Sequence, residues 1–312
     1  MINTAMRPVV LILTVLAIVG FWAPMRSAKA ELIGEIPYRI DYNGWYTVDV
    51  VVNDDGPYAF VVDSGATISS VFANLAVKSE MTPADREPVR IIGLSGAEMH
   101  DAVRLGDFVI GPITINNKIG VILDDWGPDR QTPAGVLGVD VLSRFLVEFD
   151  KRESVIRLHT KNTAIEEIDG RWAGIKLEPV SFEGAAGRIY KIPVEMNGVD
   201  IECVIDLGAN GTIINRAAVD ALIDVNADTD RTRRSQQLHD IFDNAETAPP
   251  VRVRRTKIAR ARWRNKVFLV HDALFFEELG VNETPFCLLG SDLMQSRSFI
   301  FDFEGEQFLI RR

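Results

Sequence analysis

Two parts of this chain follow the same plan, and this internal duplication constrains the fold more than any other feature. An apolar segment ending in Asp-x-Gly-Ala occurs at residues 59–66 and again at 202–209, with its aspartates 143 residues apart. A Leu-Gly-x-Asp motif at 137–140 and 289–292 then follows in each half, with a spacing of 152 residues. Because order and spacing agree over most of the chain, we predict two related lobes.

Each half has the composition of a β-rich domain. Residues 46–52 and 189–196 favour strands and end in turn residues, and 251–254 and 260–264 alternate with a period of two. Short helices are expected at 215–223 and after each Leu-Gly-x-Asp motif, where Asp140 and Asp292 could cap the first turn. Apolar segments ending in Asp follow at 145–150 and 298–302. The polar stretch 160–174 is expected to link the lobes.

The first thirty residues are typical of an export signal. Arg7 supplies a positive charge, residues 9–22 are apolar, and Ala28-Lys29-Ala30 is a small-x-small cleavage site. The apolar run is shorter than the roughly 20 residues of a membrane span, although an uncleaved anchor remains the alternative. We therefore predict a signal peptide over 1–30, an N-terminal lobe over 31–160 and a C-terminal lobe over 161–312. The protein is expected to be exported, in the periplasm or secreted, without stable membrane insertion after cleavage.

Charge and composition exclude several function classes. The net charge is −10, and it becomes −13 without residues 1–30, which hold three cations and no acid. Such an acidic body argues against nucleic-acid binding. Two cysteines and four histidines, with no H-E-x-x-H motif, argue against a metal site. We expect neither a metal nor another cofactor.

The repeated Asp-x-Gly loops can carry chemistry. A buried strand fixes the backbone before Asp63 and before Asp206, and the following glycine permits a tight turn beside the carboxylate. A pseudo-twofold axis would bring the two carboxylates together, where they share one proton. One can then act as a base toward water and the other as an acid toward a carbonyl oxygen.

Asp63-Ser64-Gly65-Ala66, after Phe60-Val61-Val62, resembles the D-[ST]-G-[AST] loop of aspartic peptidases. Both halves match the plan of a retropepsin-like lobe, so the chain is most similar to the bacterial exported retropepsin-like aspartic proteases with two lobes in one chain. The resemblance implies a mostly β fold of two β-barrel lobes related by pseudo-twofold symmetry, with the active site at their interface. It also implies a monomeric aspartic endopeptidase that hydrolyses polypeptides of the envelope or periplasm.

By this resemblance, Asp63 and Asp206 are the catalytic pair, and Ser64, Gly65 and Gly208 support the two loops. The alternative role for each aspartate is a cap at a strand-to-turn junction. Leu207 departs from the family pattern, which has a hydroxyl that reaches the backbone of the opposite loop. Ser64 can form its half of this contact, whereas Leu207 cannot. Ala66 and Ala209 follow the glycines where the pepsin-like branch often has Ser or Thr. Fewer hydroxyl donors should leave the carboxyls less acidic, which predicts activity at mildly acidic to near-neutral pH.

A substrate-covering flap is a candidate role for Gly93, Leu94, Ser95 and Gly96, which form a glycine-bounded turn between strand-like runs. A simple hairpin turn is the alternative. The corresponding stretch of the second half, 242–250, is acidic, contains prolines and lacks such a glycine pair. We therefore expect a working flap in one lobe only.

The two cysteines and a cluster of basic residues leave alternatives open. In the retropepsin-like plan the strands that carry Cys203 and Cys287 are neighbours, so a disulfide and two buried thiols are both compatible with the sequence. Eight Lys or Arg residues lie within 251–266. They suggest either a docking face for acidic partners or anionic envelope lipids or, as we favour from the alternation, the solvated side of a hairpin.

Two other hypotheses compete with the active monomeric protease. A catalytically degenerate protease fold could bind peptides or a protein without cleaving them, which Leu207 and the unequal flaps suggest. Alternatively, two copies of the first lobe could pair across chains, with the second lobe as a scaffold.

Overall fold

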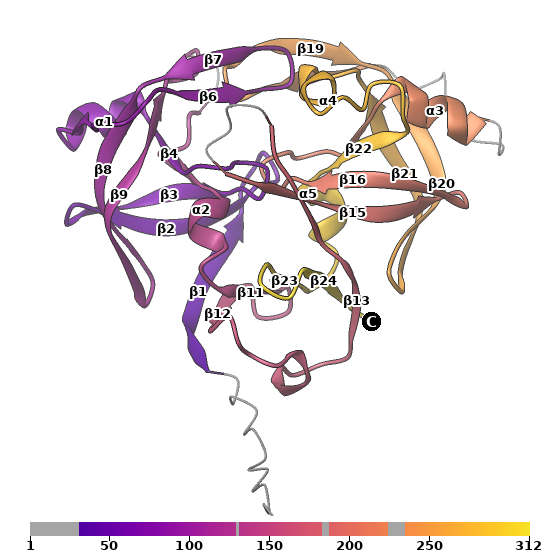
Figure 1. Cartoon of the computed structure of the whole chain (residues 1–312), viewed down its shortest axis with the longest axis horizontal. Helices are drawn as coiled ribbons and strands as arrows, with labels where there is room; N and C mark the ends of the chain where they lie inside the picture. Colours follow the sequence, from indigo (N-terminus) through magenta and orange to yellow (C-terminus); the bar gives the residue numbers. More distant parts are fainter. Residues whose placement is uncertain (1–30, 129–130, 183–186, 224–234) are drawn as a thin grey trace, which may run out of the picture.

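The computed structural model describes residues 31–128, 131–182, 187–223 and 235–312. The predicted signal peptide, residues 1–30, lies outside the described residues. Figure 1 shows two lobes side by side, joined below by a shared sheet. The fold is mostly β, as the sequence predicts, and each lobe contains one closed six-stranded barrel.

The barrel of the first lobe (barrel 1) has the strand order β2-β3-β10-β4-β9-β8 and closes through pairing of β2 with β8. Its strands are β2 (Tyr46–Val52), β3 (Asp55–Val62), β10 (Gly135–Leu137), β4 (Ser70–Phe72), β9 (Ile113–Leu123) and β8 (Ala102–Ile110). The short strand β5 (Thr82–Pro83) extends this sheet beyond β8. Alternating side chains fill the interior, where Val48, Val50 and Val52 are fully buried.

The second barrel (barrel 2) repeats this topology in the order β15-β16-β22-β17-β21-β20, closed by β15 with β20. Its strands are β15 (Ile189–Met196), β16 (Val199–Ile205), β22 (Phe286–Leu289), β17 (Ile213–Ile214), β21 (Ala261–Val270) and β20 (Pro250–Ile258), with β14 (Glu178–Val180) paired to β15. The predicted strands at 46–52 and 189–196 match β2 and β15, so the β-favouring runs identified these elements correctly.

A six-stranded sheet below the barrels contains strands from both halves of the chain, and we call it the platform. Its order is β13-β24-β23-β11-β12-β1, with β1 (Leu32–Ile40), β11 (Leu146–Asp150), β12 (Val155–His159), β13 (Trp172–Lys176), β23 (Phe299–Asp302) and β24 (Gln307–Arg311). At its centre the duplicated strands β11 and β23 pair antiparallel with each other, with Phe149 opposite Phe299. This is the pairing that a twofold relation between the lobes produces.

The linker between the lobes is shorter than predicted. The expected linker, residues 160–174, contains a 3-10 turn at Ile165–Glu167. The last three residues of this stretch, 172–174, belong to β13. The sequence signal for this strand is weak, because β13 is stabilised by its pairing with β24 at the edge of the platform rather than by a local pattern.

The helices are short, as expected: α1 (Ala73–Lys78), α2 (Val139–Leu142), α3 (Arg216–Ile223), α4 (Leu274–Glu278) and α5 (Ser291–Met294). The expectation that Asp140 and Asp292 cap helices is wrong, since α2 and α5 begin after glycines without a side-chain cap. Asp140 instead accepts hydrogen bonds from Ser69, and Asp292 from Thr212. Both aspartates therefore fix the loop that follows each Asp-x-Gly motif. None of the helices in the described part of the chain has the length and apolar character that a bilayer crossing requires.

Candidate active site

Asp63 and Asp206 occupy equivalent positions at the ends of β3 and β16. Each strand pairs in parallel with the strand before a Leu-Gly motif, β10 or β22. The amide of Asp63 donates to Leu137 O over 2.9 Å, and that of Asp206 to Leu289 O over 3.0 Å. This pairing holds both aspartates at the interface of the lobes, where their side chains are hydrogen-bonded to each other. Both come from one chain, so the described dyad needs no second copy.

Ser64 connects the two aspartate loops. Its hydroxyl donates to the carbonyl of Ile205 over 2.8 Å and accepts from the amide of Leu207 over 3.1 Å. The side chain of Leu207 is fully buried in the hydrophobic core. The loops are therefore joined by one hydroxyl, and the second loop contributes a buried apolar side chain where a second hydroxyl contact would otherwise lie.

The two glycines of the loops allow the carboxyls to meet. A Cβ on Gly65 would lie 2.5 Å from Cγ of Asp206, and a Cβ on Gly208 would overlap the carboxyl of Asp63. Each loop thus makes room for the aspartate of the opposite lobe. Only glycine provides this space, which explains its place in both copies of the motif.

Burial raises the pKa of both carboxyls, by different amounts. The pKa of Asp63 is raised by burial, but hydrogen bonds from Asp206 and from the amides of Gly65, Gly208 and Ala66 limit the rise. The pKa of Asp206 lies well above its ordinary value because burial and the neighbouring charge of Asp63 both disfavour its ionisation. The arrangement can therefore hold one carboxyl ionised and the other protonated, with one proton shared by the pair.

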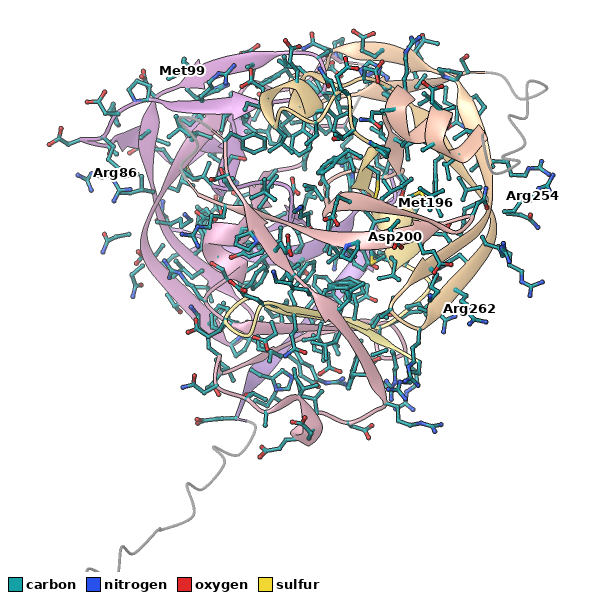
Figure 2. All side chains as sticks on the ribbon, turned by 45° about the vertical axis from the view of Figure 1, so that its right-hand side comes forward. Arg86, Met99, Met196, Asp200, Arg254 and Arg262 are labelled. Carbon is teal, nitrogen blue, oxygen red and sulfur yellow. A yellow bond between two sulfur atoms is a disulfide. The ribbon has the colours of Figure 1, made fainter. Side chains whose placement is uncertain are left out.

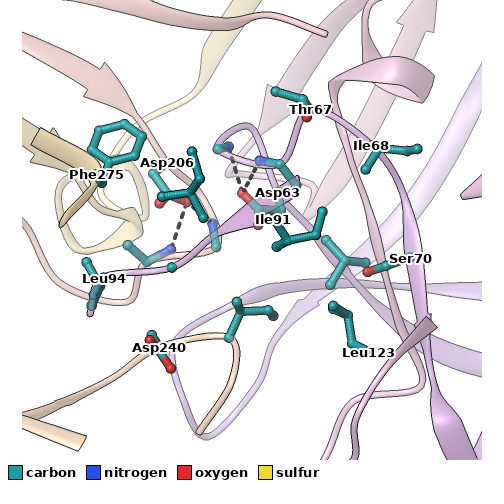
Figure 3. A pocket seen from close by; sticks show the side chains of 18 of the residues that line it. Asp63, Thr67, Ile68, Ser70, Ile91, Leu94, Leu123, Asp206, Asp240 and Phe275 are labelled. Carbon is teal, nitrogen blue, oxygen red and sulfur yellow. Dashed lines mark hydrogen bonds between the residues drawn. The ribbon is translucent and has the colours of Figure 1, made fainter. Parts of the chain in front are cut away.

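A cavity of about 200 Å³ lies above the dyad, and both carboxyls line it (Figure 3). Its wall is mainly apolar. In the first lobe the rings of Trp45 and Trp126 lie in this wall with centroids 5.6 Å apart, and Phe72 packs behind Trp126 at 5.4 Å. In the second lobe Phe182 and Phe275 are in edge contact at 5.3 Å. Apolar side chains of a bound molecule would fit these walls, with the polar dyad between them.

The candidate flap is the hairpin of β6 (Val89–Ile92) and β7 (Ala97–His100), and residues 90–94 of it line the cavity. Gly93 and Leu94 line the cavity, while Ser95 and Gly96 do not. The second lobe also has a hairpin at this cavity, formed by β18 (Gln236–His239) and β19 (Ala245–Ala248), which the sequence did not indicate. Its turn is built on Asp240, which accepts hydrogen bonds from the amides of Phe242 and Asn244, so it needs no glycine pair.

Contacts between the lobes close the roof of the cavity. Ser95 Oγ donates to Asp240 Oδ2 over 3.0 Å, and the amide of Leu274 donates to Leu94 O over 2.8 Å. Trp126 Nε1 donates to the carbonyl of Ile241 over 3.0 Å. On the outer side, Arg90 forms two hydrogen bonds of 2.7 Å with Glu278.

A disulfide joins Cys203 and Cys287 in barrel 2. The two residues are directly opposite in the parallel pair β16–β22, three residues before Asp206 and Gly290. Of the two arrangements compatible with the sequence, the structure has the disulfide. It fastens the strand that carries Asp206 to its neighbour.

Sequence reasoning missed several cavity residues. Trp45, Trp126, Asp240 and Arg90 line the cavity, although they lie outside the repeated motifs. Trp45 and Trp126 lie near Asp-rich turns, and this pattern could have identified them as candidates. The pair Arg90–Glu278 spans 188 positions and has no local signature. The described residues hold no group of three or more His, Cys, Asp or Glu placed to bind a metal.

Two barrels with one Asp-x-Gly loop each, and a carboxyl pair under hairpins at their interface, define the architecture of a two-lobed acid protease. In agreement, the family model for aspartyl proteases matches residues 48–141 and 192–293, once in each lobe. The chain belongs to the aspartyl protease family. No curated protein matches the chain.

Proposed function

We propose that this protein is an active aspartic endopeptidase whose water-activating groups are Asp63 and Asp206. The observation that carries the proposal is the contact between these carboxyls, whose pKa values are both raised by burial, at the base of an apolar cavity. An ionised and a protonated carboxyl at one point are the two groups that direct hydrolysis of an amide requires.

In the proposed reaction a water molecule lies between the dyad and the peptide carbonyl. The Asp63 carboxylate takes a proton from this water as its oxygen bonds to the carbonyl carbon, and Asp206 gives its proton to the carbonyl oxygen. Asp63 then gives its proton to the amide nitrogen, Asp206 takes a proton from one hydroxyl of the tetrahedral intermediate as the carbonyl re-forms, and the C–N bond breaks, which restores the original protonation of the dyad. No covalent bond to the enzyme forms.

The test is cleavage of a diverse peptide mixture by wild type, Asp63→Asn and Asp206→Asn. We expect both variants to lose roughly 10²- to 10⁴-fold in rate, which is the usual contribution of a general acid or base. Asp124→Asn, at an exposed position, is the matched control and should cleave normally. Cleavage that survives Asp206→Asn would contradict the role of the second lobe.

The proposal includes a pH dependence. Activity requires one proton on the dyad, so the rate should fall on both sides of an optimum. Because burial raises both pKa values, the optimum should lie at mildly acidic to near-neutral pH. A profile that peaks only below pH 3 would be inconsistent with this dyad environment.

A second candidate function is peptide or protein binding without cleavage. Leu207 favours it, because the hydroxyl of Ser64 bonds the backbone of the second loop and Leu207 has no hydroxyl to return that contact. Folded wild-type protein that binds members of the peptide mixture but releases no product would establish this function instead.

We further propose that the protease is exported and acts as a monomer on polypeptides of the envelope or periplasm. The leader-like residues 1–30 support export, and a disulfide suits an oxidising compartment. Mass spectrometry of the protein from its host should find an N-terminus at Glu31 and no free thiol. A native N-terminus at Met1 in a membrane fraction would favour the uncleaved anchor, and a larger active species in gel filtration would contradict the monomer.

A further inference from the structure

Most of the exposed side chains on the hairpin of β20 and β21 are arginines, and we call this the arginine surface. Residues 250–270 contain eight Lys or Arg and no acid, in a chain with a net charge of −10. Figure 2 shows Arg254 and Arg262 extending from the outer side of barrel 2. The exposed residues of the hairpin are Arg254, Arg255, Arg260, Arg262, Arg264 and Asn265. Every exposed position is therefore cationic except one, which is polar and neutral.

The register of the hairpin places like charges opposite each other. Arg255 faces Arg264, and Lys257 faces Arg262. Like charges in directly opposed positions destabilise an antiparallel pair. Among the described residues, Glu195 is the acid that offsets them, with a 2.7 Å ion pair to Lys257. The charges of Arg255 and Arg262 add to that of Lys257 in lowering the pKa of Glu195. In the described part of the chain, one carboxylate thus serves Lys257, Arg255 and Arg262.

The same hairpin in barrel 1 shows that the fold does not require these charges. In β8 and β9 the charged residues are Arg104, Asp107 and Lys118. Lys118 is buried and paired with Asp140, and Asp107 accepts a hydrogen bond from the amide of Asn117. An arginine surface is therefore specific to the second lobe.

We propose that this arginine surface docks the protein on a membrane of anionic phospholipids. A protein partner would call for apolar anchors at the centre of the contact, and the exposed positions of the hairpin offer none. Phosphate groups spread over a bilayer suit separate guanidinium groups on a barrel wall. Each arginine near an anionic surface strengthens binding about fivefold, and the effect fades beyond a Debye length.

Docking through this surface would leave the cavity accessible. The residues that line the cavity come from other elements, and the hairpin lies on the outer side of barrel 2, away from the lobe interface (Figure 1). The proposal does not rest on catalysis, and it can be tested whether or not the dyad is active.

The test is co-sedimentation of the full protein, as isolated from its host, with vesicles of phosphatidylcholine alone or mixed equally with phosphatidylglycerol. We expect binding to the anionic vesicles only, with loss at high salt. The triple variant Arg255→Gln, Arg262→Gln, Arg264→Gln should partition roughly 100-fold less, and the corresponding Lys variant should retain most of the binding. Removing opposed like charges should not lower the melting temperature, which checks that the variants fold.

The matched control removes the same charge elsewhere, with Arg86→Gln, Arg104→Gln and Arg152→Gln, and should bind like wild type. Equal binding to both kinds of vesicle, or equal loss in the two triple variants, would overturn the proposal. Binding of polyglutamate without binding of anionic vesicles would also overturn it and would indicate an acidic protein partner.

Discussion

The two lobes share one topology but support their aspartates differently. In the first lobe Phe60 lies opposite Gly135, and its ring fills the space where a side chain on that glycine would lie. In the second lobe the equivalent pair is the disulfide Cys203–Cys287. The first lobe therefore fastens its aspartate strand by packing, and the second by a covalent bond.

A similar difference occurs behind the aspartate loops. Asp140 in the first lobe is bound by Ser69 and by the buried ammonium group of Lys118. Asp292 in the second lobe has the hydroxyl of Thr212, 2.7 Å away, and the more distant charge of Lys266. Duplicated lobes can thus retain one geometry while the forces that maintain it diverge. Four predictions test this comparison, from the largest expected effect to the smallest.

Loss of the disulfide should weaken the second lobe most. The bond closes a loop of 84 residues, so chain entropy predicts a loss of about 4 to 5 kcal/mol of unfolding free energy in the double variant Cys203→Ala, Cys287→Ala. Denaturant unfolding should detect this loss, and reductant should lower the stability of wild type but not of the variant. Equal stability of variant and wild type would show that packing alone suffices in both lobes.

Asp292 should make the second lobe sensitive to pH. Burial raises its pKa to about 6 from the ordinary 3.8. Between these values the folded chain keeps a proton that the unfolded chain has lost, so stability should fall by roughly 3 kcal/mol as the pH rises through this window. In Asp292→Asn this fall should disappear, leaving the variant more stable than wild type at pH 7. Asp200→Asn, at an exposed position, should keep the wild-type slope.

Substitution of either loop glycine by alanine should lower the rate of peptide cleavage. In Gly65→Ala and in Gly208→Ala the new methyl group would displace the aspartate of the opposite lobe. A misplacement of about 1 Å costs roughly 100-fold in rate, and peptide cleavage would measure it. Gly211→Ala is a matched control, since nothing lies within 4 Å of its Cβ position. A strong loss in one variant only would show that the lobes contribute unequally.

Ser64 should have the smallest effect. Ser64→Ala leaves the amide of Leu207 and the carbonyl of Ile205 without their cross-lobe partner, which costs about 1 to 2 kcal/mol. Thermal unfolding and cleavage should both show the loss, and Ser64→Thr, which keeps the hydroxyl, should reverse most of it. No loss in Ser64→Ala would mean that the packing of Leu207 holds the loops together.

The sequence predicted those features that depend on local pattern and on repetition. The Asp-x-Gly loops, the strands at 46–52 and 189–196, and the helices after each Leu-Gly motif were found because short-range preferences and the duplication agree. The barrels followed from the family resemblance.

Features that depend on long-range contacts could not be predicted in the same way. The second roof hairpin was missed because its turn is held by the side chain of Asp240 rather than by glycines. Asp140 and Asp292 were misassigned because a helix cap and a link to a distant hydroxyl look alike in sequence. The disulfide stayed open until the register of β16 and β22 placed the two cysteines side by side.

The two lobes are joined in different ways at the two ends of the molecule. Because β11 and β23 are hydrogen-bonded to each other, the lobes are joined firmly at that end, and the roof at the opposite end consists of separate side-chain and main-chain ties such as Arg90–Glu278. Relative movement of the lobes about the platform would be largest at the roof and smallest next to the platform, with the dyad between them.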